Sequence, residues 1–357
     1  MKPHDDWQNA RNVLCVRLDS IGDVLMTTPA LRAVKESGAD RKVTLLTSPS
    51  AAAAGRLTPH VDEIIVYDAP WLKGTAERDS ARDLSLVHRL AAGSFDAAII
   101  FTVFSQSALP AALVCLLANI PLRLAHVREN PYHLLTTWIP DPEPASGIRH
   151  EVERQLALVR EVGWNASDTG LVLQVPDDAR AHVDRVLRSI GIEPRGRWIV
   201  LHPGATAPSR RYPADRFAEA AQLVASQWDC RVIVTGDAGE RELVDDVCEQ
   251  IGTDAVGLAG RLDLAALAAL IEASPLLITN NTGPAHVAAA VGTPVVDVYA
   301  LTNPQHTPWR VKSRVLSYDV PCRNCFRSVC PEGHNNCLRL IAPSDLAQAA
   351  SDLLAER

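Results

Sequence analysis

The chain has 357 residues, of which 47% are hydrophobic and 22% are charged, the composition of an ordinary soluble globular protein. This much apolar side chain excludes disorder over the bulk of the chain, and a formal charge of -7 without a long basic run argues against nucleic-acid binding. The length predicts two domains of ~150 residues or one large domain. Its polar, acid-containing first residues and its eight cysteines lead us to expect a soluble cytoplasmic protein with reduced thiols.

Short apolar runs rich in β-branched residues alternate with helical stretches along the whole chain. Strands are expected at 13–18, 42–47, 63–67, 97–103, 198–202, 231–236, 275–280 and 294–300, and helices at 148–162, 214–227, 240–251, 264–273 and 344–354. The uncharged stretch 97–122 is interrupted by Ser105, Pro110 and Asn119, so it favours a strand and an apolar helix over a membrane span. Continuous apolar strands separated by helices are typical of parallel sheets covered on both faces.

The strand-helix alternation restarts at Trp198, after an intervening polar region. We expect the hinge near Pro176, which gives an N-terminal domain over 1–175 and a C-terminal domain over 176–357. The predicted fold class is therefore α/β, with two doubly wound, Rossmann-like parallel-sheet domains that face a central cleft. In such sheets ligands bind at the carboxyl ends of the strands, so the loops that follow the strands carry the candidate sites.

The first such loop contains Ser20, Gly22 and Asp23, and we expect a helix to start at about Asp23. Asp23 is either an N-cap carboxylate or a functional carboxylate at the mouth of this strand-helix loop. Asp19 lies nearer the strand and has no comparable positional argument.

The loop after the strand at 198–202 contains Gly204, Thr206, Arg210 and Arg211. A glycine turn, hydroxyls and paired guanidinium groups at a strand end suit an anionic oxygen cluster such as a diphosphate. The alternative is a solvated pair of arginines on a surface loop.

The loop after the strand at 275–280 contains Asn281, Thr282 and Gly283, and a helix is expected to follow from Pro284. The free N–H groups at this helix start form a seat for an anion. His286, in the first turn, is interpreted as a structural residue.

Three common ligand-binding motifs are missing from the sequence. It has no G-x-G-x-x-G after its first strand, no phosphate-binding G-x-x-x-x-G-K-[ST] and no D-x-D, which argues against NAD binding, a P-loop and a metal-diphosphate clamp respectively.

Four cysteines follow a C-x2-C-x4-C-x6-C pattern, namely Cys322, Cys325, Cys330 and Cys337. Four thiols in so short a segment can form a tetrahedral structural zinc site. The alternatives are four reduced thiols in a loop, adventitious metal uptake or, less favoured, an iron–sulfur cluster.

Together, SIGDVLMTTPAL (20–31), HPGA with RRYP (202–213) and TNNTGPAHVAAAVGTPVV (279–296) resemble glycosyltransferase family 9, the heptosyltransferases of the bacterial lipopolysaccharide inner core. The resemblance covers roughly residues 12 to 355 and rests on the order and spacing of the three motifs. It implies the two-domain GT-B architecture, with the N-terminal domain on the acceptor side and a donor-binding C-terminal domain that also carries the Cys-rich loop (322–337) and the final helix. It also implies inverting transfer of a heptose from an ADP-activated donor to a sugar hydroxyl, with no metal or cofactor required for catalysis.

The resemblance places the family's catalytic acid on Asp23 and its basic phosphate-binding position on Arg210, where Lys is often found. Its N-D-[ST]-G loop falls on the sequence from Asn280 to Gly283, so that Asn281 replaces a common acid. An acid that contacts the donor nucleoside falls on Glu240. The donor-binding set is therefore Thr206, Arg210, Glu240, Asn281, Thr282 and Gly283.

In this interpretation Asp23 is the general base, and Arg210 with the helix start at Thr282 stabilises the departing diphosphate. The implied partners are an ADP-activated sugar and a lipid-linked or core oligosaccharide acceptor, and the resemblance allows a peripheral contact with the inner face of the inner membrane. Two alternatives stay open: a GT-B-fold nucleotide-sugar epimerase and a non-catalytic nucleotide-sugar binding protein.

Overall fold

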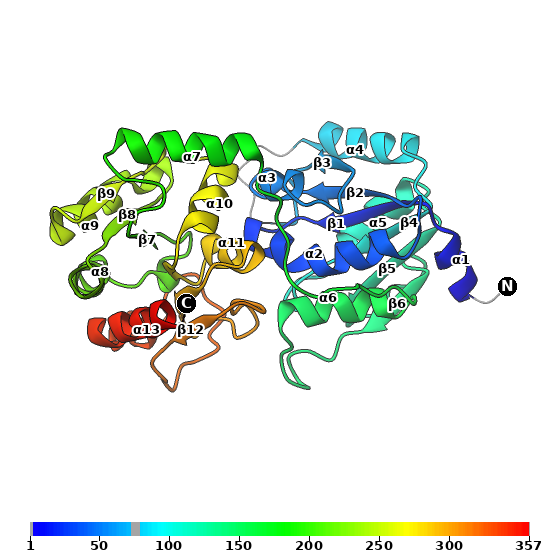
Figure 1. The fold of residues 1–357 in the computed structure, drawn as a ribbon. Coiled ribbons are helices and arrows are strands. Elements are labelled where there is room, and N and C mark those ends of the chain that lie inside the picture. The colour runs from blue at the N-terminus through cyan, green and yellow to red at the C-terminus, as the bar shows by residue number, and fades with distance from the viewer. Residues whose placement is uncertain (1–2, 73–78, 357) are drawn as a thin grey trace. The chain divides into compact units, whose positions relative to one another are not determined.

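The computed structural model describes residues 3–72 and 79–356, which divide into two compact units, Met1–Val172 and Leu173–Arg357. Figure 1 shows both units along the chain. The boundary between them follows Val172, whereas the sequence places it after residue 175. None of the helices in these ranges is long and apolar enough to cross a membrane.

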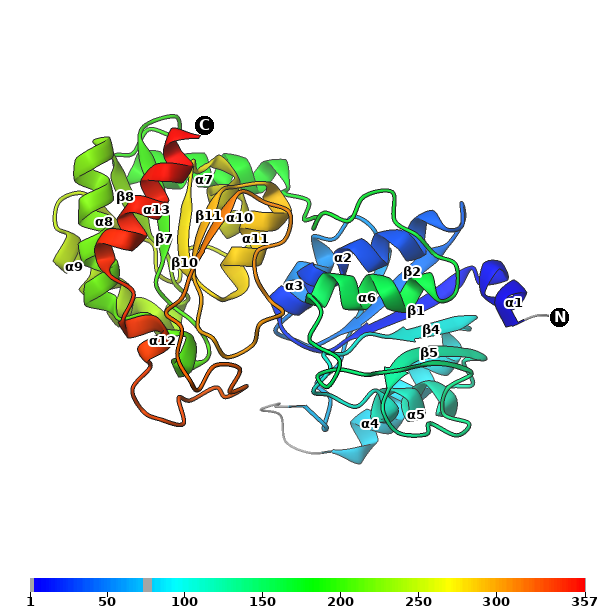
Figure 2. The same cartoon turned by 90° about the horizontal axis from the view of Figure 1, so that it is seen from below.

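Unit 1 contains, in chain order, α1 (Pro3–Asn9), β1 (Asn12–Arg17), α2 (Ile21–Glu36), β2 (Lys42–Thr47), α3 (Ala52–Arg56), β3 (Glu63–Val66), α4 (Ser80–Ala92), β4 (Ala97–Ile100), α5 (Leu109–Leu117), β5 (Leu122–Val127), β6 (Thr137–Pro140) and α6 (Glu151–Arg160). Over the described residues its six strands form one parallel sheet in the order β3-β2-β1-β4-β5-β6. One face carries α2, α3 and α6 and the other carries α4 and α5, which Figure 2 shows from below.

Unit 2 contains α7 (Asp177–Ser189), β7 (Trp198–His202), η1 (Pro208–Arg210), α8 (Ala214–Trp228), β8 (Arg231–Val234), η2 (Ala238–Glu240), α9 (Arg241–Ile251), β9 (Ala255–Gly257), α10 (Leu264–Ala273), β10 (Leu277–Asn280), α11 (Gly283–Val291), β11 (Val295–Val298), β12 (Ser313–Leu316), α12 (Asn336–Arg339) and α13 (Pro343–Ala355). Within its described part the sheet is again six-stranded and parallel, in the order β12-β11-β10-β7-β8-β9. The last helix, α13, packs beside α8 against the core of this unit.

Both sheets have the same strand order once the strands of each unit are counted along the chain: 3-2-1-4-5-6. The order reverses between β1 and β4 in unit 1 and between β7 and β10 in unit 2. Doubly wound sheets bind their ligands at this switch point, beyond the carboxyl ends of the two central strands. The topology thus directs attention to the loops after β1 and β4 and to those after β7 and β10.

Candidate functional site

Asp23 lies at the unit 1 switch point, in the first turn of α2. The helix begins at Ile21 with Ser20 as its N-cap, so the predicted start at Asp23 is wrong. Ser20 has the extended backbone typical of an N-cap, and Asp23 is the third helical residue. The Asp23 carboxylate accepts hydrogen bonds from the Ser20 backbone N–H at 3.1 Å and from its hydroxyl at 2.7 Å. Ser20 and Asp23 thus form a capping box, so the Asp23 carboxylate supports the start of the helix as well as lying at the mouth of the loop.

Arg17, the last residue of β1, holds Asp23 from the other side. Its guanidinium is completely buried and lies among three carboxylates: Nε is 3.0 Å from Asp19, Nη2 is 3.0 Å from Asp23 and Nη1 is 2.8 Å from Glu151. Glu151 is the first residue of α6 and is itself buried. Because the carboxylates outnumber the guanidinium, the cluster is net negative when all its members are ionised, which favours the uptake of a proton.

Burial and mutual repulsion shift the titration of this cluster. Burial, together with the negative charge of Asp23, raises the pKa of Asp19 to about 6 against the opposing charge of Arg17. The pKa of Glu151 is also raised by burial. Burial lowers the pKa of Arg17, but the three carboxylates raise it more, so the guanidinium stays charged. The side chains of Asp19 and Asp23 are 13% and 15% exposed, which leaves both open to a ligand.

Asp19, which has no positional argument in the sequence, joins Asp23 in the structure. Its carboxylate shares Arg17 with Asp23 and also accepts a hydrogen bond from Gln106 Nε2 at 2.6 Å. Gln106 belongs to the loop after β4, the other strand of the switch point. A cavity of about 260 Å³ lies against these two residues, entirely within unit 1.

In unit 2 the loop after β7 brings Arg210 to the switch point. Arg210 ends the short turn η1 and donates from Nη2 to Asn303 Oδ1 at 3.2 Å, while its buried Nε has no hydrogen-bond partner among the described residues. Arg211 turns back and donates from Nε to the Ala205 carbonyl at 2.6 Å. Thr206, in the same loop, is exposed.

Asn280, at the end of β10, fixes the shape of this loop. It donates from Nδ2 to the Pro203 carbonyl at 2.6 Å and accepts at Oδ1 from the backbone N–H of Tyr212 at 2.9 Å. The next residue, Asn281, is 1% exposed, and its Nδ2 has no hydrogen-bond partner within the described ranges. Thr282 is then the N-cap of α11, one residue earlier than the predicted helix start implies.

Glu240 reaches the same edge of the sheet from η2. Its carboxylate accepts from the backbone N–H of Asp237 at 3.0 Å and lies directly over Gly204, where any Cβ would overlap it. It is also 3.9 Å from His202 Nε2. Burial lowers the pKa of His202 to about 4, so at neutral pH this is a contact with a neutral ring rather than an ion pair. The structure therefore gathers Arg210, Glu240 and Asn281 at one edge of one sheet.

Asp297 is an ionisable residue that the sequence reasoning missed. It lies fully buried in β11, and neither carboxylate oxygen has a hydrogen-bond partner in the described part of the chain. Burial raises its pKa well above the usual value, against the attraction of Arg210. The available signal was a lone acid inside the apolar run PVVDVYA (294–300), which was interpreted only as a buried strand.

The four cysteines lie in a loop that is tied to the Arg210 loop. Ser209 donates from its backbone N–H to the Ser328 carbonyl at 3.0 Å and from its hydroxyl to the Arg327 carbonyl at 2.7 Å. Cys322 Sγ is 4.0 Å from His334 Nε2. No group of three or more His, Cys, Asp or Glu side chains in residues 3–72 and 79–356 is arranged to hold a metal ion. Zinc binding stays a prediction, and it requires the thiols to move together.

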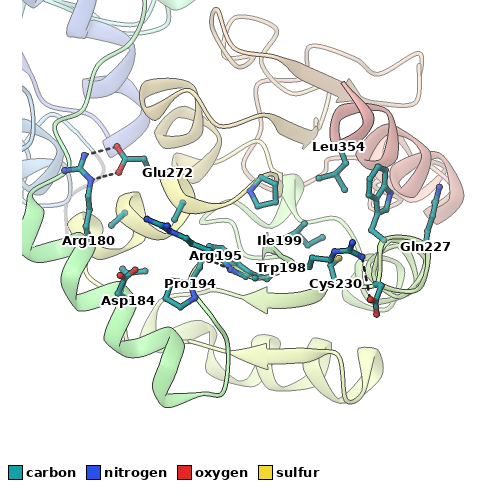
Figure 3. A pocket seen from close by; sticks show the side chains of 18 residues that line it. Arg180, Asp184, Pro194, Arg195, Trp198, Ile199, Gln227, Cys230, Glu272 and Leu354 are labelled. Atoms are coloured by element: carbon teal, nitrogen blue, oxygen red, sulfur yellow. Dashed lines mark hydrogen bonds and ion pairs between the residues drawn. The ribbon is translucent and has the colours of Figure 1, made fainter. Parts of the chain in front are cut away.

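A larger cavity, of about 890 Å³, lies in unit 2 at the other end of the strands, away from the loops described above. Figure 3 shows Trp198, the first residue of β7, among its lining residues, with Arg180 and Glu272 paired at 2.7 and 2.9 Å at one end. Cys230 and Pro275 in its wall precede β8 and β10. The cavity is thus at the amino ends of the strands, away from the switch point, and it is not the candidate donor site.

A family model described as glycosyltransferase family 9 (heptosyltransferase) matches residues 84–336. Lipopolysaccharide heptosyltransferase 3 of Escherichia coli K12 is 26% identical over 81% of this chain and 82% of its own length. Lipopolysaccharide heptosyltransferase 2 of the same strain is 24% identical over 96% and 99%.

Two solved structures share the fold. The family 9 glycosyl transferase from Veillonella parvula has a TM-score of 0.83 at 23% identity, covering 97% of this chain and 98% of that one. The E. coli ADP-heptose LPS heptosyltransferase II has a TM-score of 0.76 at 23% identity, covering 97% and 99%. The predicted fold class, α/β with two doubly wound parallel sheets of the GT-B type, is confirmed.

Proposed function

Because the chain belongs to glycosyltransferase family 9 and is a glycosyltransferase, we propose that it transfers a heptose from an ADP-activated donor to a hydroxyl of a lipopolysaccharide-core glycan, with inversion at the anomeric carbon. The names of its relatives, which are lipopolysaccharide heptosyltransferases, support the substrate class. The observation that carries the proposal is Asp23, a partly exposed carboxylate fixed at the unit 1 switch point by Arg17 and Ser20.

Asp23 is assigned the role of general base. The acceptor hydroxyl oxygen attacks the anomeric carbon, its proton passes to the Asp23 carboxylate, and the bond from that carbon to the diphosphate oxygen breaks. ADP leaves with the electron pair of that bond. A single displacement of this kind inverts the configuration, and a base of suitable position contributes roughly 10²–10⁴-fold to the rate.

The donor diphosphate is assigned to unit 2. Arg210 supplies a guanidinium for charge-assisted hydrogen bonds, and the N-terminus of α11 at Thr282 and Gly283 supplies free backbone N–H groups. Both stabilise the negative charge that develops on the leaving group. Glu240, a carboxylate beside the loop after β7, is assigned to the ribose or base of the nucleoside, for which an acceptor of hydroxyl and amino hydrogens is suited.

The proposal is tested by following ADP release from ADP-heptose in the presence and absence of a core oligosaccharide. We expect release to require the acceptor strictly and the product to have the inverted anomeric configuration. Donor consumption without an acceptor would favour an epimerase or hydrolase instead. A thermal-shift screen of nucleotide sugars identifies the donor independently, because a ligand that binds only the folded state raises its stability.

Arg210→Ala is expected to weaken ADP binding by roughly tenfold to a hundredfold, because a charge-assisted contact contributes about 1.5–3 kcal/mol. The loss of stability should be small, since Arg210 makes a side-chain hydrogen bond only to Asn303 among the described residues, and its one further interaction named above is the attraction to the buried Asp297. Titration calorimetry with ADP measures the effect. Arg211→Ala is the matched control, because that guanidinium points to its own loop at Ala205, and it should lose less affinity. Equal ADP affinity in wild type and Arg210→Ala would remove Arg210 from the site.

We also propose, on the C-x2-C-x4-C-x6-C spacing alone, that the chain binds about one structural zinc. Elemental analysis or native mass spectrometry of protein purified without a nickel column should find the metal. Activity should survive a short exposure to EDTA, because no proposed step uses a metal. Folded, active protein that contains no metal would contradict the prediction.

Peripheral contact of the protein with the inner face of the inner membrane also stays a prediction. Flotation with liposomes tests it.

A further inference from the structure

Asp297 lies in β11, inside the unit 2 sheet. Its neighbours Val296 and Val298 pack into the core that contains α13. Because side chains alternate along a strand, Asp297 is directed to the opposite face, where α11 packs against β10 and β11 (Figure 2). The N-terminus of α11 is the one assigned above to the donor diphosphate. Asp297 thus shares a face of the sheet with the helix of the proposed donor site.

The Asp297 carboxyl group is buried without a polar partner. It is 0% exposed, and neither Oδ1 nor Oδ2 has a hydrogen-bond partner among the described residues. Burial raises its pKa well above the ordinary value, and the charge of Arg210 opposes that shift. The guanidinium of Arg210 is held at Nη2 by Asn303, whereas its buried Nε has no hydrogen-bond partner in the ranges described. The ionised form of Asp297 therefore depends on Arg210 for its stability.

The surroundings of Asp297 offer no comparable second cation within the described part of the chain. The residues in register with it on β10 and β12 are the uncharged Thr279 and Val315. The titratable side chains on the elements around it are, besides Arg210, Tyr299 on β11, His286 on α11, His306 after β11, Glu272 on α10 and Arg314 on β12. Glu272 is paired with Arg180, and Arg314 is paired with Glu356.

A diphosphate bound to Arg210 changes the charge that Asp297 experiences. The negative charges of the ligand offset the attraction of the guanidinium and repel an ionised carboxylate, so the protonated form of Asp297 becomes favoured. Coupling between two binding events is reciprocal. Protonation of Asp297 must therefore strengthen diphosphate binding by the same factor by which the diphosphate strengthens protonation.

We propose that Asp297 is a positioning residue of the donor site that acts through Arg210: it takes up one proton when a diphosphate binds and releases it when the diphosphate leaves. The proton comes from solvent and returns to it, and no bond of the substrate changes in this step. The proposal rests on the proposed function, because Arg210 is the diphosphate contact there. It adds that donor binding is linked to the uptake of a proton.

The first test measures proton uptake in the unmodified chain. ADP-glucose is the probe, because its diphosphate is esterified at both ends and does not titrate near neutral pH. Calorimetric titrations in buffers of different ionisation enthalpy, from pH 6 to pH 9, give the number of protons bound with the ligand. We expect uptake approaching one proton and binding roughly tenfold tighter at pH 6 than at pH 9, a usual size for coupling between sites. Binding without proton uptake across this range would overturn the proposal.

The second test uses Asp297→Asn, which has the charge of the protonated form at every pH. We expect this variant to bind ADP-glucose at pH 9 about as tightly as the unmodified chain does at pH 6, without the proton uptake. Asp246→Asn, an exposed acid on α9, is the control of equal charge change and should behave like the unmodified chain. Undiminished proton uptake in Asp297→Asn would assign the proton to another group and overturn the proposal.

His286→Gln and His306→Gln keep the proposal falsifiable if Asp297→Asn folds poorly. Proton uptake that persists in both variants supports Asp297, and its loss in either would overturn the assignment. The proposed function fails in a different way. Binding of ADP-glucose without proton uptake leaves heptosyl transfer standing, whereas proton-linked binding in an enzyme that transfers no heptose would support Asp297 and overturn the heptose assignment. No binding of ADP or ADP-glucose would overturn the donor site and this proposal together.

Discussion

Asp23→Asn is expected to lower turnover by roughly 10²–10⁴-fold, the usual contribution of a general base, while the melting temperature and the ADP affinity change little. The amide keeps the size of the carboxylate and can still accept a hydrogen bond from the Ser20 backbone N–H. Arg17 retains Asp19 and Glu151 as partners, so the buried cluster loses one of three negative charges and no cation. Steady-state rates, calorimetric ADP binding and thermal melts measure the three quantities.

Ser20→Ala is the control that separates catalysis from capping. It removes the N-cap hydroxyl of α2, and with it one of the hydrogen bonds to Asp23, and should cost about 0.5–2 kcal/mol of stability. It keeps the Asp23 carboxylate, the hydrogen bond from the Ser20 backbone N–H and the contact with Arg17. We expect the two variants to show opposite patterns. Asp23→Asn should keep its stability and lose most of its turnover, whereas Ser20→Ala should lose stability and turn over much faster than Asp23→Asn. An Asp23→Asn enzyme with near-normal turnover would end the general-base mechanism.

Arg17→Met is expected to destabilise the protein by about 3–5 kcal/mol at pH 7.5, because it leaves buried carboxylates without a counter-charge. The loss should shrink as the pH falls. The pKa of Asp19 is raised to about 6 and that of Glu151 is raised as well, and both rise further without Arg17. A raised acid pKa favours the folded state while the group is protonated, and this contribution is lost as the pH rises through the folded-state pKa. Urea denaturation at pH 5 and pH 7.5 compares the two conditions.

The matched second variant is Arg17→Met with Glu151→Gln. Replacing the most buried acid of the cluster removes one unpaired charge, so part of the lost stability should return at pH 7.5. An equal loss at both pH values, with no recovery in the double variant, would show that packing rather than charge explains the effect of Arg17.

The central strands could be predicted from sequence because they are apolar on both faces. The run at 198–202 matches β7, and 264–273 matches α10, residue for residue. The missed strands have a different character. The short strands β6, β9 and β12 lie at sheet edges and carry mixed residues, and β5 contains Arg123, whose buried guanidinium donates to the Leu134 and His133 carbonyls. In the sequence, an arginine at this position is typical of a solvated loop. In the fold, backbone carbonyls accept the hydrogen bonds of its guanidinium, so it can lie in a buried strand.

The residues of the candidate site also fall into two groups, those that could be predicted from the sequence and those that could not. Asp23 and Arg210 could be proposed because they follow a strand in a recognisable local pattern. Arg17 could not, since it stands inside an apolar strand and its partner Glu151 is far away along the chain, on α6. Asp19 gains its meaning only through Gln106, from the loop after another strand. Residues that act through long-range contacts carry no local signature in a single sequence.

Gly204 and Glu240 are far apart in the sequence but share one space beyond the carboxyl end of β7. The glycine is needed for the space above it, which the Glu240 carboxylate fills, and not for an unusual backbone conformation. A side chain at 204 would push the Glu240 carboxylate aside, which costs little because that carboxylate is the end of a flexible side chain, but it would move the acid away from its proposed nucleoside contact. A substitution at 204 should therefore alter the nucleotide preference while leaving the fold intact.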